Sequence, residues 1–364
     1  MLGQLGGTEA RAGFRVLVAK QVVAHAKELR RGTRSIMLQA LGQIAGRLLR
    51  DLRGSLAHPR REDSQRPKGS AAAPRTYHPL QRVIITDDVA RTLFGEYAGH
   101  HASARGDEEI GWDLLGLRRE HEAVVMATLP AGANRDASAG HVLFNSGGQV
   151  VGSRYVRQAD RRLTIVGIVH THPGSLRHPS DGDFRGDSIW VGQLRGQDGI
   201  FGIGTADNHP PNGSEVAYQP RPHVQCLGKL RFSWYALGSG EKNYRPLPAE
   251  FTLGPDLARP LHSVWASVER HAEPIERLFR QQTGLTLEVI AAMKGPALAV
   301  NVPLAEPGQS IRVLLEEDRT MYYWVHDGVP VAAEPHEPRI DRAVYLLLAE
   351  LAAGAPESLP EKGN

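Results

Sequence analysis

The chain of 364 residues is 41% hydrophobic and 23% charged, which is typical of a globular protein; at about 100–200 residues per domain it predicts two folded units plus a tail. No apolar run approaches the roughly 20 residues of a membrane span, so we exclude a spanning helix and expect a cytoplasmic protein. The single cysteine, Cys226, excludes an internal disulfide framework and a cysteine-based zinc site, and it fits a reducing cytosol.

Charge is distributed unevenly along the chain. Residues 1–76 hold 15 Lys/Arg against 5 Asp/Glu, a net charge of +10, whereas the other 28 basic and 35 acidic residues sum to −7. The pattern predicts basic amphipathic helices at 14–30 and 33–54, and a flexible Pro- and Ala-rich linker completes an extension over 1–79. This extension is a dispensable or mis-started segment, a targeting peptide, or a binder of an acidic surface. Its charge alone gives little support for nucleic-acid binding.

Strands and helices then alternate over residues 80–250, which predicts a mixed α/β domain with a β-sheet flanked by helices. We expect a strand VIIT at 83–86 and then a helix capped by Asp87 or Asp88 that runs to about His101. Strands follow at Gly111–Leu117, Glu122–Leu129 and His141–Asn145, and then a helix over 147–160. The last elements are the strand LTIVGIVH at 163–170, a helix around 182–195, and the strands GIFGIGTA at 199–206 and LRFSWYAL at 230–237.

Residues 255–355 predict a separate small α+β module of unknown role. It begins with a helix from Pro260 to Gln282, continues with strands at 297–302, 311–317 and 321–327, and ends with a helix over 339–353. A module outside the domain at 80–250 can serve to dock a partner protein.

The segment from His170 to Asp183 holds the residues best suited to bind a metal ion. His170 and His172 end an apolar strand, and because side chains alternate along a strand, both imidazoles project to the same face. Imidazole nitrogens and a carboxylate oxygen are the ligands that Zn²⁺ accepts at about 2.0–2.2 Å. Asp183, at the start of a predicted helix, is the obvious third ligand, and catalytic zinc sites commonly leave the fourth position to water.

This segment resembles the JAMM motif of the MPN/JAB metalloprotease family, H-[ST]-H-P-x(6)-S-x-x-D, at every fixed position. The resemblance implies that His170, His172 and Asp183 hold zinc. It also implies that the hydroxyl of Ser180 helps to bind the oxyanion of the reaction.

The family also uses an upstream glutamate in a pattern like E-x-G-G-x-L-x-G. The segment from Glu109 to Gly116 matches except at Trp112, which replaces the second glycine. By this resemblance Glu109 is the general base, and Glu108, Glu120 and Glu122 are the alternatives.

The chemistry requires these residue types. A water on zinc has a pKa near 7, and a carboxylate within hydrogen-bond reach can take its proton and return it to the leaving amine. The resemblance implies a peptidase or isopeptidase that acts at the C-terminus of a ubiquitin-like or sulfur-carrier protein. The competing interpretation is a non-catalytic MPN scaffold.

Other candidate residues carry plainer interpretations. His178 lies inside the motif loop but has no role in the family, so we expect a solvated side chain. Ser180 lacks the G-x-S-x-G elbow of a hydrolase nucleophile. Cys226 has no base beside it and is expected to be a small buried apolar residue.

Overall fold

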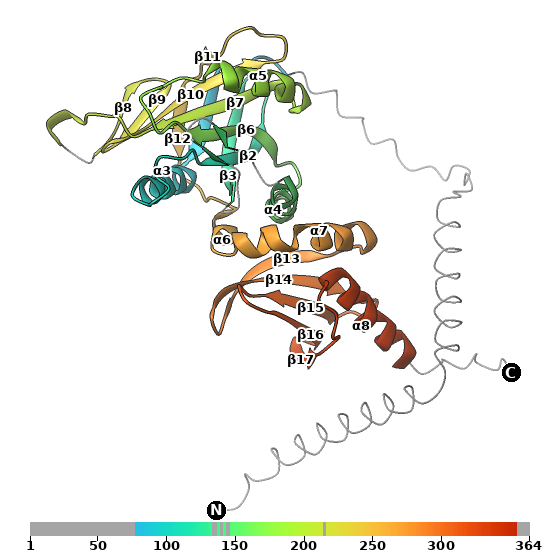
Figure 1. Cartoon of the computed structure of the whole chain (residues 1–364). Helices are drawn as coiled ribbons and strands as arrows, with labels where there is room; N and C mark the ends of the chain where they lie inside the picture. The colour runs from blue at the N-terminus through green and yellow to red at the C-terminus, as the bar shows by residue number, and fades with distance from the viewer. Residues whose placement is uncertain (1–76, 133–136, 139–140, 143–145, 214–215, 355–364) are drawn as a thin grey trace, which may run out of the picture. The chain divides into compact units, whose positions relative to one another are not determined.

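The computed structural model describes residues 77–132, 137–138, 141–142, 146–213 and 216–354 (Figure 1). Within these ranges no helix is long and apolar enough to span a membrane. The helices expected at 14–30 and 33–54 lie outside the described residues. Everything described falls within one compact unit, Pro74–Asn364.

A ten-stranded mixed sheet forms the centre of the first half of this unit (Figure 1). Its strands are β1 (Arg82–Thr86), β2 (Gly111–Arg118), β3 (Glu122–Pro130), β6 (Thr164–Thr171), β7 (Asp198–Thr205), β8 (Ala217–Arg221), β9 (Val224–Leu227), β10 (Leu230–Gly238), β11 (Arg245–Pro246) and β12 (Ala249–Thr252). They lie in the order β12-β1-β3-β2-β6-β7-β10-β9-β8, and β11 pairs with β10. β2 is antiparallel to β3 and β6, and β6 is parallel to β7. A small hairpin, β4 (Ala137–Ser138) and β5 (His141–Val142), forms a separate sheet.

Helices cover both faces of the main sheet. Successive side chains of a strand point to opposite faces, and here apolar side chains point to both. α3 (Asp87–His101) packs on one face, where Phe94 joins the sheet residues Trp112 and Phe232 in a buried core. α4 (Ser146–Ala159) and α5 (Asp181–Trp190) pack on the other face. Two short 3₁₀ helices, η1 (Val191–Gln193) and η2 (Pro211–Gly213), complete this half.

The C-terminal half contains a five-stranded antiparallel meander. Its strands follow chain order as β13 (Thr286–Ala292), β14 (Gly295–Pro303), β15 (Gln309–Leu315), β16 (Thr320–His326) and β17 (Val329–Ala333). The helices that precede and follow it are α6 (Arg259–His262), α7 (Trp265–Gln281) and α8 (Ile340–Gly354). Residues of α7 and α8 share one buried cluster with alternate residues of the meander.

The predicted mixed α/β class is confirmed, and two local predictions need correction. Thr86, and not Asp87 or Asp88, is the N-cap of α3; the two aspartates lie in the first turn, where negative charge favours the helix dipole. The helix expected over Pro260–Gln282 is divided into α6 and α7 at Val264, whose ψ of 14° leaves the helical range. Of the strand expected at 141–145, the described part is His141–Val142.

The two halves are joined by a shared core. Leu129 of β3 and Val151 of α4 belong to the same buried cluster as Trp265 and Val268 of α7. Gly152 permits the close approach of the two helices, since a Cβ there would lie 3.1 Å from the Trp265 ring and 2.8 Å from Leu129. The side chain of Gln158 adds hydrogen bonds of 2.7 and 2.8 Å to the backbone of Leu287.

We expect Trp265→Ala to lower the stability of the whole described unit by about 3–5 kcal/mol, because it leaves a cavity where the halves meet. Chemical denaturation should show one transition shifted as a whole. Met293→Ala is the control, since that side chain is 97% exposed and its loss should change stability by less than about 0.5 kcal/mol. Two transitions, of which only one responds to Trp265→Ala, would contradict a shared core.

Candidate metal centre

The two histidines of the motif lie at the carboxyl end of β6, and Asp183 lies in the first turn of α5. Both imidazoles are buried, with 6% of each residue exposed. Thr171 between them points to the other side, and its hydroxyl accepts a hydrogen bond from the backbone N–H of Ile110. The strand period therefore places both rings on one face, as expected from the sequence.

Three potential ligand atoms converge at this strand end. The Nε2 atoms of His170 and His172 are 3.1 Å apart, and they lie 3.3 and 3.5 Å from the two carboxylate oxygens of Asp183. Tetrahedral bonds of 2.0–2.1 Å separate adjacent ligand atoms by about 3.3 Å. The triangle of His170, His172 and Asp183, whose candidate ligand atoms all lie within 4.8 Å of one another, is thus close in size to three positions of a tetrahedral Zn²⁺ site.

Hydrogen bonding sets the tautomer that a metal site needs. Nδ1 of His172 lies 2.8 Å from the carbonyl oxygen of Leu176, which can only accept, so Nδ1 carries the proton and Nε2 of the neutral ring presents a lone pair. Burial acts to lower the pKa of His172, but Asp183, the Leu176 carbonyl and Glu109 raise it overall. Burial acts to raise the pKa of Asp183, yet the two neighbouring imidazoles lower it, so this carboxylate is ionised.

Ser180 is the N-cap of α5 and forms a capping box with Asp183. Its hydroxyl oxygen accepts from the N–H of Asp183 at 3.2 Å, and its own N–H donates to Asp183 Oδ2 at 2.6 Å. One carboxylate oxygen is thereby fixed by the helix start, and Oδ1 faces His170. His178 is exposed, as expected, and its ring contacts the carbonyl of Pro179.

Glu109 immediately precedes β2 and is buried, with 4% of the residue exposed. Its neighbour Ile110 accepts a backbone hydrogen bond from Thr171 at 2.9 Å, so the chain at Glu109 runs beside the segment that carries the two histidines. The contribution of Glu109 to the raised pKa of His172 also indicates that its charge lies near that ring. The structure thus brings Glu109 and the ligand triangle to one end of the sheet.

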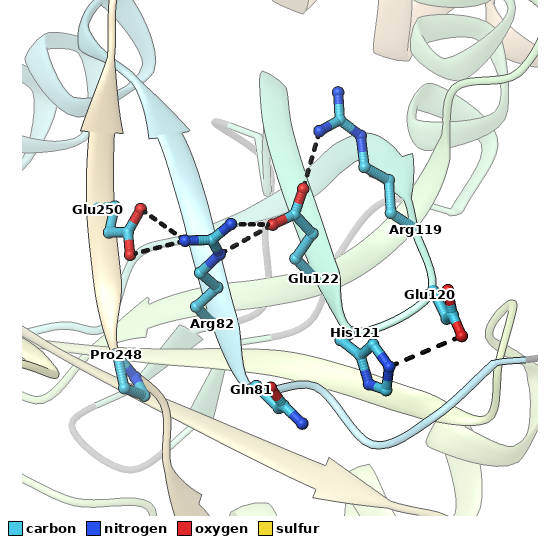
Figure 2. Close-up of a pocket in the computed structure, with 8 residues that line it drawn as sticks. All are labelled: Gln81, Arg82, Arg119, Glu120, His121, Glu122, Pro248 and Glu250. Atoms are coloured by element: carbon cyan, nitrogen blue, oxygen red, sulfur yellow. Dashed lines mark hydrogen bonds and ion pairs between the residues drawn. The ribbon is translucent and has the colours of Figure 1, made fainter.

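The alternative glutamates lie in other surroundings. Glu108 is engaged by Arg105, at 2.7 Å from its Nε. Glu120 and Glu122 follow β2, whose eight residues span about 25 Å and separate them from the motif end of the strand. Figure 2 shows Glu122 paired with Arg82 in a pocket lined mostly by charged side chains. These contacts favour Glu109 as the group nearest the histidines.

A second set of possible ligands, His78, Glu120 and His121, lies on the surface. The two histidine rings are stacked, with centroids 4.6 Å and planes 15° apart, so an ion in the plane of one ring lies out of the plane of the other. Their side chains are 44–63% exposed. This geometry is unfavourable for one metal ion bound by both histidines. The buried set of His170, His172 and Asp183 is the better candidate.

Sequence reasoning missed Asp187 and Tyr244. Asp187 lies one helical turn after Asp183 and is buried, and it accepts a 2.7 Å hydrogen bond from the hydroxyl of Tyr244. The four-residue spacing from Asp183 was the available signal for Asp187. Tyr244 lies in the loop after β10, where no periodic pattern points to a contact with α5.

A mixed sheet flanked by helices, with two histidines and an aspartate converging at one strand end, defines an α/β domain with a candidate metal site. Residues 91–211 match the family described as prokaryotic homologs of the JAB domain. The solution structure of protein DSY2949 from Desulfitobacterium hafniense is similar over 47% of this chain and 94% of that chain, at 14% sequence identity and a TM-score of 0.31. No curated protein matches the sequence.

We expect the purified protein to bind about one zinc ion per chain and His172→Ala to lose it, because the variant removes one of three ligands. Elemental analysis after dialysis measures the content. His178→Ala is the matched control, since it removes an exposed imidazole of the same loop. Equal zinc in His172→Ala and the parent would contradict the assignment.

Proposed function

We propose that the chain is a zinc-dependent peptidase or isopeptidase of the JAMM type. The single observation that carries the proposal is the burial of a carboxylate, Glu109, at the same strand end as the triangle of His170, His172 and Asp183. The match of residues 91–211 to the prokaryotic JAB family supports the same reaction class. The substrate we propose is the C-terminal peptide or isopeptide bond of a ubiquitin-like or sulfur-carrier protein, cut in the cytoplasm.

Each residue has a distinct role in this proposal. His170, His172 and Asp183 would hold the zinc ion, which when bound would supply Lewis acidity and lower the pKa of a water. Glu109 accepts the proton of the attacking water and returns it to the leaving nitrogen. The Ser180 hydroxyl oxygen accepts from the N–H of Asp183, so its hydrogen is available to donate to the developing oxyanion.

The principal alternative is a non-catalytic MPN scaffold. Four polar side chains buried or half-buried at one strand end favour the enzyme, since burying such groups is costly unless they are paired or bind a metal. Docking of a partner protein on residues 255–355, or of an acidic surface on residues 1–76, can accompany either function. Neither docking role accounts for the candidate metal site at His170, His172 and Asp183.

We expect cleavage of at least one member of a panel of ubiquitin-like and sulfur-carrier proteins fused at their C-termini to a reporter. A chelator should abolish cleavage and added zinc should restore it, because His170, His172 and Asp183 are only ligands and the metal ion is the Lewis acid. Gel electrophoresis and mass spectrometry would identify the cut bond. Cleavage that persists fully after metal removal would contradict the zinc mechanism.

We expect Glu109→Gln to retain zinc while turnover falls by about 10²–10⁴, because the amide keeps the shape of the side chain but cannot accept a proton. Steady-state kinetics and zinc content are measured together. Glu108→Gln is the matched control, since that carboxylate is engaged by Arg105, and it should remain active. If Glu108→Gln were inactive and Glu109→Gln active, the base would be Glu108.

A further inference from the structure

Asp187, which is buried, and Tyr244, which is half-buried, form a hydrogen-bonded pair near the start of α5. Asp187 is 7% exposed and lies four residues after Asp183 on α5, so the two carboxylates project from the same side of the helix. The Tyr244 hydroxyl donates to Asp187 Oδ2 at 2.7 Å. Nothing in the proposed reaction uses either residue.

An aromatic cluster fixes Tyr244. Its ring contacts Phe184, Phe201 and Tyr235 edge-on, with centroids 5.9, 5.5 and 6.4 Å away. Burial and the neighbouring Asp187 raise the pKa of Tyr244, so the phenol stays protonated and remains a donor. The pair therefore has a defined direction, with Tyr244 as donor and Asp187 as acceptor.

Asp187 lies close enough to His170 for the charge of that imidazole to act on it. Burial raises the pKa of Asp187 to about 6, while the Tyr244 hydrogen bond and the charge of His170 act to lower it. Asp187 and His170 form no direct ion pair, although α5, which carries Asp187, packs on Ile168 of β6, the strand that carries His170. A carboxylate and an imidazole that make no direct contact can be joined through a water molecule.

The Nδ1 atoms of His170 and His172 differ in their hydrogen-bond partners. Nδ1 of His172 is satisfied by the Leu176 carbonyl. For Nδ1 of His170, the part of the chain that the structure describes provides no direct hydrogen-bond acceptor. Metal-ligating histidines almost always donate this second N–H to a carboxylate, a carbonyl or a water, which fixes the ring.

We propose that Asp187, oriented by Tyr244, is a positioning residue that holds the His170 imidazole through a bridging water and so sets the affinity of the site for zinc. The inference rests on the proposed function only in taking His170 as a ligand. Tyr244 occupies Oδ2 of Asp187, which leaves Oδ1 to accept from the water. Asp187 would thereby hold the ring of His170 as the Leu176 carbonyl holds the ring of His172.

The test measures zinc affinity by competition with a chromophoric chelator, together with the d–d absorption of the Co²⁺-substituted protein. We expect Asp187→Asn to weaken zinc binding by about 10–100-fold and to change the Co²⁺ spectrum, because the amide keeps the size of the carboxylate but loses its charge. Tyr244→Phe should change both in the same direction, by less. Neither readout requires a substrate.

Asp198→Asn is the matched control for a purely structural role. Asp198 is an equally buried carboxylate, bonded to Arg245 and to the N–H of Leu80. It lies about 17 Å along β7 from Ile203, which pairs with His170. This variant should lower the melting temperature and leave zinc affinity and the Co²⁺ spectrum unchanged.

The outcomes separate the two proposals. If the parent binds zinc and His172→Ala does not, but Asp187→Asn binds as tightly as the parent, the positioning role is wrong and the proposed function stands. A lower melting temperature with unchanged affinity in Asp187→Asn would likewise reduce the pair to a structural tie. A parent that binds no zinc would overturn the proposed function and this inference together.

Discussion

The site depends on the pairing of the start of β2 with the end of β6. Thr171 donates its backbone N–H to the carbonyl of Ile110, and its hydroxyl accepts from the Ile110 N–H at 3.0 Å. These contacts join residues 61 positions apart in the chain. They place Glu109 beside the strand end that carries His170 and His172, so one antiparallel pairing unites a proposed base with its proposed ligands. A shift of this register by one residue would turn the histidines to the opposite face of the sheet.

The start of α5 supplies the third ligand by an ordinary feature of helices. Ser180 and Asp183 satisfy each other's backbone N–H groups in a capping box, which fixes the side chain of Asp183 before any metal binds. Only Oδ2 is used by the box, and Oδ1 remains directed at His170. The same residue thus stabilises the helix and completes the triangle. Such preorganisation reduces the entropy that a metal ion would otherwise have to offset on binding.

The sequence was informative where a short pattern has a direct geometrical meaning. The spacing of His170 and His172 at the end of an apolar run predicted their common face, and the long periodic elements were found within a few residues of their limits. Contacts between distant segments were beyond that reasoning. No local pattern reveals that Tyr244 bonds to Asp187 or that Trp265 packs on Gly152, because both depend on how separate elements pack. Short edge strands such as β8 and β12 also escaped prediction, since few of their residues are buried.

Charge gives a physical reason to favour an enzyme over a scaffold. The carboxyls of Glu109, Asp183 and Asp187 gather around two imidazoles in a largely buried place, and each buried ion costs several kcal/mol unless it is compensated. Protons can compensate them, as the raised pKa values of Asp187 and His172 indicate. A divalent cation at the triangle compensates the same charges while leaving neutral imidazoles and ionised carboxylates. Hydrolysis needs the groups in that state, which agrees with the proposed function.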